Sequence, residues 1–176
     1  MLAVALDLLR GFGLSGAGIN DIVRGSAAPK GSVYHFFPGG KLQIAEEALR
    51  AYVPQVQAFI EAAMAGRRSN AARVGALFEA FAQRVQAQDF RRSCAVGTVS
   101  LDLSEDMEPL RPVLVAALDS WARSIASHVD LGDARRSRSF ADFVVTAIEG
   151  AYVRARAEHS PQAFREAGRW LAHCVD

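Results

Sequence analysis

The sequence contains very little lysine. Among its 20 basic residues only Lys30 and Lys41 are lysines, and all the others are arginines. With 19 acidic residues the formal net charge is +1, so the chain as a whole has no charge that would attract nucleic acid or an acidic surface. A nucleic-acid site in this chain must therefore be local, and the two lysines mark the segment to inspect first.

Cysteine and histidine are also scarce. Cys94 and Cys174 lie far apart and match neither a CxxC pair nor a zinc-ligand spacing. They are typical of small buried hydrophobic residues in a reducing compartment, so we expect a cytoplasmic protein. The four histidines show no ligand spacing, and no motif supplies a nucleophile with a base and an orienting group. We therefore expect no enzyme, no metal and no cofactor.

Long hydrophobic runs and strand patterns are absent too. The opening residues MLAVALDLLR are interrupted by Asp7 and Arg10 and are too short to span a bilayer. No stretch shows the alternation of β-branched residues that a sheet needs. Because of these absences we expect neither a membrane partner nor a β fold.

Apolar residues recur at helical spacing instead. The pattern predicts helices over about 41–64, 71–88, 112–129, 140–151 and 164–174. The first 37 residues hold three shorter helical segments, roughly 2–11, 18–25 and 29–36, separated by glycines. We therefore predict an all-α fold, in which a three-helix helix-turn-helix head (1–40) is joined by a long helix to a C-terminal helical bundle (41–176).

The segment 29–36 is expected to enter a DNA major groove as the second helix of the pair. Helical geometry directs Pro29, Val33, Phe36 and Phe37 toward a small core. The outward face is expected to hold Lys30, Gly31, Tyr34 and His35, with Ser32 at the boundary. Lysine neutralises phosphate, glycine permits close approach, and Tyr and His bond phosphate or stack on sugar.

Local charge supports this interpretation. Between Ile22 and Ala45 the basic residues are Arg24, Lys30 and Lys41, and the stretch contains no acidic residue. Lys41, after the Pro-Gly-Gly turn, is expected to reach a flanking phosphate. A solvated helix whose aromatics pack against a neighbour remains an alternative on pattern and charge alone.

Two stretches of the head resemble the TetR family of transcriptional regulators, most strongly the branch that includes LmrA and YxaF. They are GLSGAGINDIV (13–23) and PKGSVYHFFPGGKLQIAEEAL (29–49). RSCAVGTVSLDL (92–103) resembles, more loosely, the branch's Gly-Cys-Pro segment, which ends in Glu. The resemblance implies that the operator is contacted by Lys30, Gly31, Tyr34, His35 and Lys41. It also implies that Gly18 and Asn20 lie near the DNA backbone.

The sequence departs from the family pattern at three positions of the head. The family's helix-capping Thr is Ala17 here, and a cap is worth about 1 kcal/mol. The turn position usually held by Gly is Ala27, where a left-handed conformation would cost about 1–2 kcal/mol. Where the family has a histidine directly before the Phe of the motif, this sequence has Phe36. Its histidine lies one place earlier, at His35.

The resemblance also implies a homodimer formed by the last two long helices, with a palindromic operator. The expected interface residues are Ala147, Gly150, Ala151, Phe164, Gly168 and Leu171. Intrachain packing is the alternative for the small residues among them.

For the small-molecule effector the sequence indicates only a region of the body. Its expected wall is Phe59, Phe78, Phe81, Cys94, Val99, Trp121 and Phe143. An apolar wall favours a lipophilic or aromatic ligand. The sequence thus predicts a ligand-responsive DNA-binding regulator, expected to act as a repressor because that is the family default. The alternative is a helical interaction or ligand-binding module that has lost DNA binding.

Overall fold

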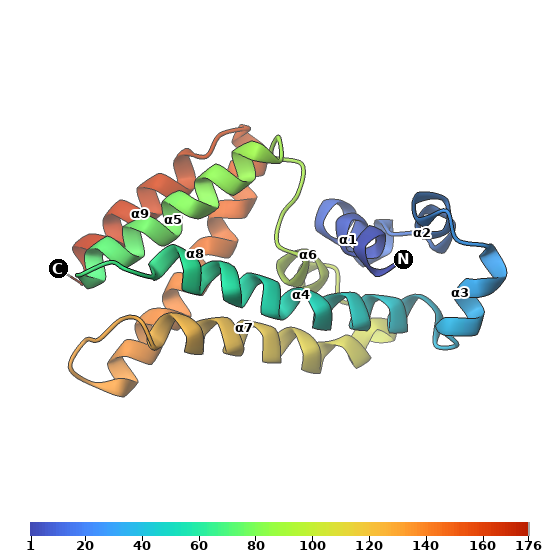
Figure 1. The fold of residues 1–176 in the computed structure, drawn as a ribbon, viewed down its shortest axis with the longest axis horizontal. Coiled ribbons are helices and arrows are strands. Elements are labelled where there is room, and N and C mark those ends of the chain that lie inside the picture. The colour runs from blue at the N-terminus through green and yellow to red at the C-terminus, as the bar shows by residue number, and fades with distance from the viewer. Residues whose placement is uncertain (176) are drawn as a thin grey trace. The chain divides into compact units, whose positions relative to one another are not determined.

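The computed structural model describes residues 1–175, without the side chain of Lys30, and every regular element in that range is helical. Figure 1 traces the elements from the blue α1 to the red α9. They are α1 (Leu2–Gly16), α2 (Ile19–Ser26), α3 (Lys30–Phe36), α4 (Gly40–Met64), α5 (Asn70–Ala87), α6 (Ala95–Leu101), the 3₁₀ helix η1 (Glu105–Leu110), α7 (Arg111–Ala126), α8 (Ala134–Glu158) and α9 (Gln162–His173). The predicted all-α fold is confirmed.

The chain forms two compact units. The first comprises residues 1–54 and 94–117, and the second comprises 55–93 together with the described chain from Leu118 onward. The expected functional division at residue 40 therefore falls inside the first unit. That unit also contains α6, which packs against α1.

The head of the first unit is built on short helices that share one small core. Leu9 of α1, Ile22 of α2 and Val33 of α3 are all buried. α1 is longer than the expected 2–11 segment because helical structure resumes after a break at Gly13, where φ is 69° and ψ is −172°. That conformation is one that only glycine adopts readily.

Helix α6 is the element that periodicity did not reveal. It has seven residues, too few for an apolar repeat to stand out. Ala95, Val96 and Val99 bury one of its faces. The Thr98 hydroxyl donates to the carbonyl oxygen of Leu9 at 2.7 Å, so α6 is also hydrogen-bonded to α1.

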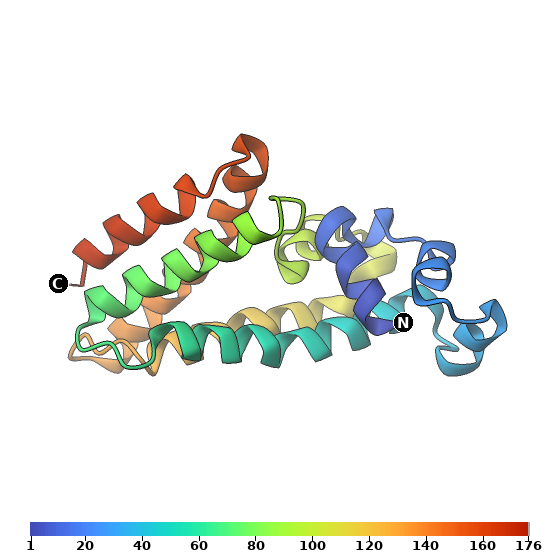
Figure 2. The ribbon, with the colours of Figure 1, turned by 45° about the horizontal axis from the view of Figure 1, so that its top comes forward.

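The second unit is organised around α5, α8 and α9, which lie side by side in Figure 2. Phe164 of α9 is fully buried, with its ring 6.0 Å from that of Phe81 and 5.1 Å from that of Tyr152. Two helices of this unit begin with side-chain caps. The Ser69 hydroxyl accepts from the amide of Ala72 at 3.1 Å at the start of α5. The Asp133 carboxylate accepts from the amide of Arg136 at the start of α8.

Burial corrects most of the expected dimer contacts. Ala151, Phe164, Gly168 and Leu171 are buried within this chain, and α9 lies so close to α5 that a Cβ on Gly168 would stand 2.5 Å from the Cβ of Phe78. These four residues pack α8 and α9 into their own unit, so they offer no surface to a second copy. Ala147 and Gly150 lie on the other side of α8, half-buried and exposed respectively.

Candidate nucleic-acid interface

The turn between α2 and α3 has the geometry of a helix-turn-helix pair. α2 ends at Ser26, and its C-cap residue Ala27 adopts the left-handed conformation with φ 52° and ψ 22°. Only Ala28 and Pro29 separate this residue from α3. The left-handed turn expected at Ala27 is therefore present, although alanine has a steric cost there that glycine would not have.

The outward face of α3 carries the expected polar groups. Gly31 and His35 are exposed, and Tyr34 is 54% exposed. A Cβ on Gly31 would meet no atom within 4 Å, so the backbone is open to close approach at this point. Ser32 is half-buried, as expected for a boundary position. The side chain of Lys30 lies outside the described residues.

The inward face of α3 is smaller than expected. Val33 and Phe37 are buried, but Pro29 and Phe36 are exposed, which corrects their assignment to the core. α3 ends at Phe36, and Phe37 leaves helical geometry with φ −128° and ψ 70°. This change of direction brings Phe37 into the core and leaves Phe36 61% exposed, with its ring edge-on to His35 at 5.0 Å.

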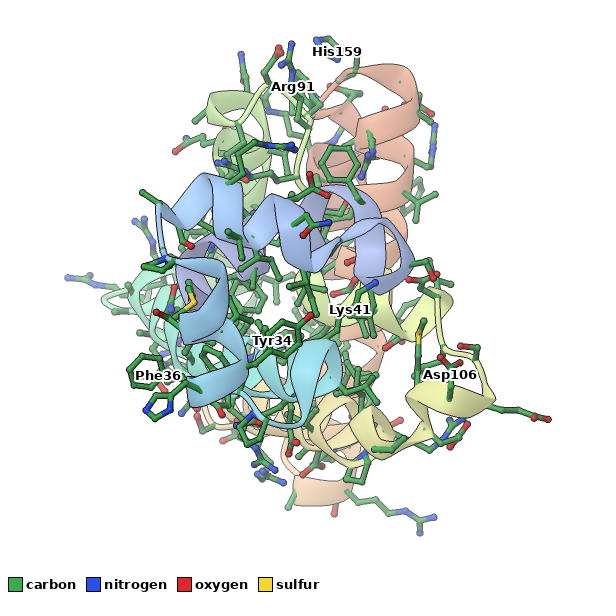
Figure 3. All side chains as sticks on the ribbon, turned by 90° about the vertical axis from the view of Figure 1, so that its right-hand side faces the viewer. Tyr34, Phe36, Lys41, Arg91, Asp106 and His159 are labelled. Atoms are coloured by element: carbon green, nitrogen blue, oxygen red, sulfur yellow. The ribbon has the colours of Figure 1, made fainter. Side chains whose placement is uncertain are left out.

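Figure 3 shows Phe36 and Tyr34 projecting from different sides of α3, with Tyr34 on the side nearer Lys41. Lys41 is half-buried, and its Nζ lies 3.5 Å from the carbonyl oxygen of Ser15. The surface around α3 thus combines the ring of Phe36 on one side with the phenol of Tyr34 and, from α4, the lysine Lys41 on the other. Such groups suit the sugar-phosphate backbone and base edges of a duplex.

The start of α2 supplies the remaining expected contacts. Gly18 is the N-cap residue and Asn20 is exposed in the first turn. Asp21, directly before the stretch that lacks acidic residues, forms an ion pair with Arg24. The pair partly neutralises Arg24, so the two lysines carry most of the local positive charge.

The expected effector residues are divided between the two units. Phe59 and Phe81 make edge-to-face contact at 4.9 Å in the second unit, where Phe78 and Trp121 are also buried. Cys94 and Val99 are buried in the first unit.

Phe143 is 59% exposed on the outer side of α8, which corrects its assignment to an interior wall. The apolar pattern of α8 contained Phe143 because this helix has apolar residues on both its inner and its outer side.

Among the described residues no group of His, Cys, Asp or Glu could hold a metal ion, and no helix is long and apolar enough to cross a membrane.

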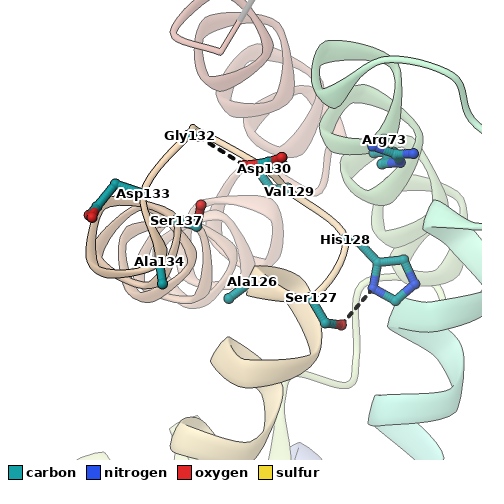
Figure 4. A pocket seen from close by; sticks show the side chains of 10 residues that line it. All are labelled: Arg73, Ala126, Ser127, His128, Val129, Asp130, Gly132, Asp133, Ala134 and Ser137. Carbon is teal, nitrogen blue, oxygen red and sulfur yellow. Dashed lines mark hydrogen bonds between the residues drawn. The ribbon is translucent and has the colours of Figure 1, made fainter.

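A surface pocket of the second unit was not anticipated from the sequence. Figure 4 shows it between the start of α5 and the loop from α7 to α8, with Arg73 and His128 on one side and Asp130 and Asp133 on the other. His128 is held by the carbonyl oxygen of Ser124, 2.9 Å from its Nδ1. Cations and carboxylates line the pocket together, so its charges favour no ligand of one sign.

Known regulators resemble this chain over much of its length. Residues 70–170 match the family model of the transcriptional regulator LmrA/YxaF-like C-terminal domain. The chain is 31% identical over 163 residues to the HTH-type transcriptional regulator Rv0196 of Mycobacterium tuberculosis, covering 89% of this chain and 82% of that protein. It is 31% identical over 122 residues to the HTH-type transcriptional regulator LmrA of Bacillus subtilis, covering 69% and 65% of the two chains.

Solved structures share the fold at lower identity. The regulatory protein TetR from Rhodobacter sphaeroides superposes with a TM-score of 0.85 at 23% identity, over 98% of this chain and 95% of that one. A cysteine variant of the TetR-family regulator CifR, solved with a 26-bp double-stranded operator, superposes with a TM-score of 0.84 at 20% identity, over 99% and 95% of the two chains. On its helix-turn-helix head, its matching C-terminal domain and these relatives, the chain belongs to the TetR family of DNA-binding transcriptional regulators.

Proposed function

We propose that this protein is a repressor that binds a palindromic operator as a homodimer and leaves it when a small, largely apolar effector binds. Residues 1–40 bind the operator, and residues 41–176 bind the effector and form the dimer. The observation that carries the proposal is the open face of α3, where Gly31, Tyr34 and His35 are exposed while Val33 anchors the helix in the core.

Operator binding is tested by a mobility shift on the duplex upstream of the protein's own gene. Lys30→Ala is expected to weaken binding and to reduce the salt slope by about 0.9 for each phosphate that the variant no longer neutralises. Arg67→Ala is the matched control, because it removes one exposed cation from the loop between α4 and α5, outside both the head and the proposed dimer surface. An unchanged salt slope for Lys30→Ala would remove Lys30 from the proposed phosphate contacts.

The dimer is proposed to form through the outer side of α8 and the neighbouring α9. Phe143, Ala147, Gly150 and Val153 follow one another at helical spacing on this side, and none of them is buried in the chain. Trp170 of α9 is 74% exposed. Large exposed aromatics beside small residues are typical of surfaces that pack against a partner.

Sedimentation equilibrium tests this surface. Val153→Asp is expected to shift the chain from dimer to monomer, because a charge would then face the apolar partner surface. Leu101→Asp is the matched control, since Leu101 is an exposed apolar residue in the first unit. A Val153→Asp protein that remains a dimer would exclude this face.

The effector is proposed to bind among the apolar residues of the second unit. Support comes from the rings of Phe59 and Phe81, with the Arg84 guanidinium 4.8 Å above the ring of Phe59. Phe78 and Trp121 are the other members of this proposed site. An aromatic or lipophilic molecule fits such surroundings, and the cation favours a π system or a partial negative charge on it.

Trp121 provides an internal probe for this site. The chain has two tryptophans, so Trp170→Phe leaves Trp121 as the sole indole. Compounds that release the operator are expected to quench or shift its fluorescence. Release by a compound that leaves Trp121 fluorescence unchanged, together with an unaltered response in Phe81→Leu, would place the effector elsewhere.

A further inference from the structure

The break in α1 frees backbone groups that another helix satisfies. At Gly13 the helical hydrogen-bond ladder is interrupted, so the amides that follow lack their normal acceptors. The amide of Ser15 instead donates to Oδ2 of Asp102 at 2.5 Å, across 87 positions of sequence. Asp102 is the C-cap residue of α6, and all of these residues belong to the first unit.

The Asp102 side chain approaches the backbone of α1 closely at this contact. A Cβ on Gly13 would lie 3.0 Å from Oδ2 of Asp102 and 3.4 Å from its Cγ. The glycine is therefore needed both for its positive φ and for the space that the carboxylate occupies. The break and the carboxylate fit each other.

Asp102 binds this segment in its ionised form. The Ser15 amide is the main cause that holds the pKa of Asp102 below its ordinary value, with further contributions from Leu14 and from the charge of Lys41. Lys41 in turn lies 3.5 Å from the carbonyl oxygen of Ser15. One carboxylate and one lysine therefore hold the donor and the acceptor of the same peptide segment.

α6 holds α1 at two points on one side. Thr98 and Asp102 are four residues apart, about one helical turn. The Thr98 hydroxyl bonds Leu9 before the break, and the Asp102 carboxylate bonds Ser15 after it. Only Ala17 and Gly18 then separate α1 from α2. The two contacts thus fix the angle at which the chain leaves α1 toward the helix-turn-helix pair.

We propose that Asp102 is a positioning residue for operator binding: its carboxylate fixes the break in α1, and through it the placement of α2 and α3. This inference rests on the proposed operator binding. Asp102 itself touches no DNA in this proposal, and it acts only through Ser15 and the segment that follows.

The test compares Asp102→Ala and Asp102→Asn with Glu105→Ala in the full chain. Glu105 is an exposed acid at the start of η1, so its removal controls for the change in net charge. Amide hydrogen exchange of the 13–18 segment reports the contact, with α9 as internal reference. A mobility shift on the upstream duplex, well below the melting temperature, reports operator affinity.

In Asp102→Ala, exchange of the 13–18 segment is expected to become about tenfold to a hundredfold faster, as for removal of a hydrogen bond to a charged group. Operator affinity is expected to fall by about fivefold or more, the usual size of coupling between sites. Asn retains an acceptor oxygen, so Asp102→Asn should recover part of the exchange protection and part of the operator affinity. Glu105→Ala should change neither the exchange rate nor the affinity.

Either of two results would overturn the proposal. Unchanged exchange at 13–18 would show that Asp102 does not hold the segment. Faster exchange with operator affinity equal to that of Glu105→Ala would show that the contact is not coupled to DNA binding. Asp102→Asn carries the same test if the alanine variant does not fold. A wild-type chain that binds no duplex would refute the proposed function, while the exchange arm would still decide the role of Asp102 at the break.

Discussion

Replacing Gly168 by alanine should separate intrachain packing from a role at a dimer surface. Gly168 lies where α9 contacts α5, and an added Cβ would stand 2.5 Å from the Cβ of Phe78 and 3.1 Å from its Cγ. Ordinary contacts between carbon atoms are about 3.5–4.0 Å. Because both Cβ atoms are fixed by their backbones, the two helices must move apart by about 1 Å.

The magnitude follows from comparison with a matched glycine. Gly75 lies inside α5 and has no atom within 4 Å of an added Cβ. Both substitutions gain about 0.8–1.0 kcal/mol of helix propensity, but only Gly168→Ala adds an overpacking cost of about 1–3 kcal/mol. The propensity gain cancels between the variants, so Gly168→Ala should be about 1–3 kcal/mol less stable than Gly75→Ala.

Urea unfolding followed by circular dichroism measures this difference at several protein concentrations. For a chain of this size about 1–3 kcal/mol corresponds to roughly 2–12 °C in melting temperature. Intrachain packing predicts the same difference at every concentration. A Gly168→Ala protein as stable as Gly75→Ala, or one destabilised only on dilution, would refute the assignment of Gly168 to the α5–α9 contact.

Three further outcomes follow from the structure. Ala27→Gly should raise the unfolding free energy by about 1 kcal/mol, because glycine removes the steric cost of the left-handed turn; equal melting curves would contradict this. Phe164→Ala should lower it by about 3–5 kcal/mol through removal of the buried ring between Phe81 and Tyr152, whereas a decrease below about 1 kcal/mol in urea unfolding would indicate a loosely packed site. The lowered pKa of Asp102 means that its contact stabilises the fold above the unfolded-state value of about 3.9, and this stabilisation disappears as pH falls toward the folded-state pKa. The stability difference between wild type and Asp102→Asn should therefore be largest near neutral pH and shrink below about pH 4; a difference constant with pH would exclude the carboxylate as its source.

Much of the fold could be predicted because helices leave a local signal. The long elements α4, α5, α7, α8 and α9 each repeat their apolar residues at helical spacing, which depends only on neighbours along the chain. Glycines marked the breaks between the three short helical segments of the first 37 residues. The turn position at Ala27 came from the family resemblance, in which glycine usually holds that place.

Residue environments were harder to predict because they depend on where each helix ends and on what packs against it. Phe36 continues the apolar pattern of α3, but the helix ends there, and Phe37 takes the buried place. Gly168 and Phe143 both have residue types that fit an interface or a cavity wall. Only the contact of α9 with α5 shows that the first is internal, and only exposure shows that the second lies on the outer surface.

The sequence by itself determined the helical class, the helix-turn-helix head and the exposed polar groups of α3, because these depend on spacing along a single helix or pair of helices. Tertiary structure alone decided which small residues are internal and how α1 is held to α6. The contact between Asp102 and Ser15 joins residues 87 positions apart, and its partners become neighbours only when α1 breaks at Gly13 and α6 packs beside it. No local pattern encodes such a pair, since neither residue needs the other to form its own helix.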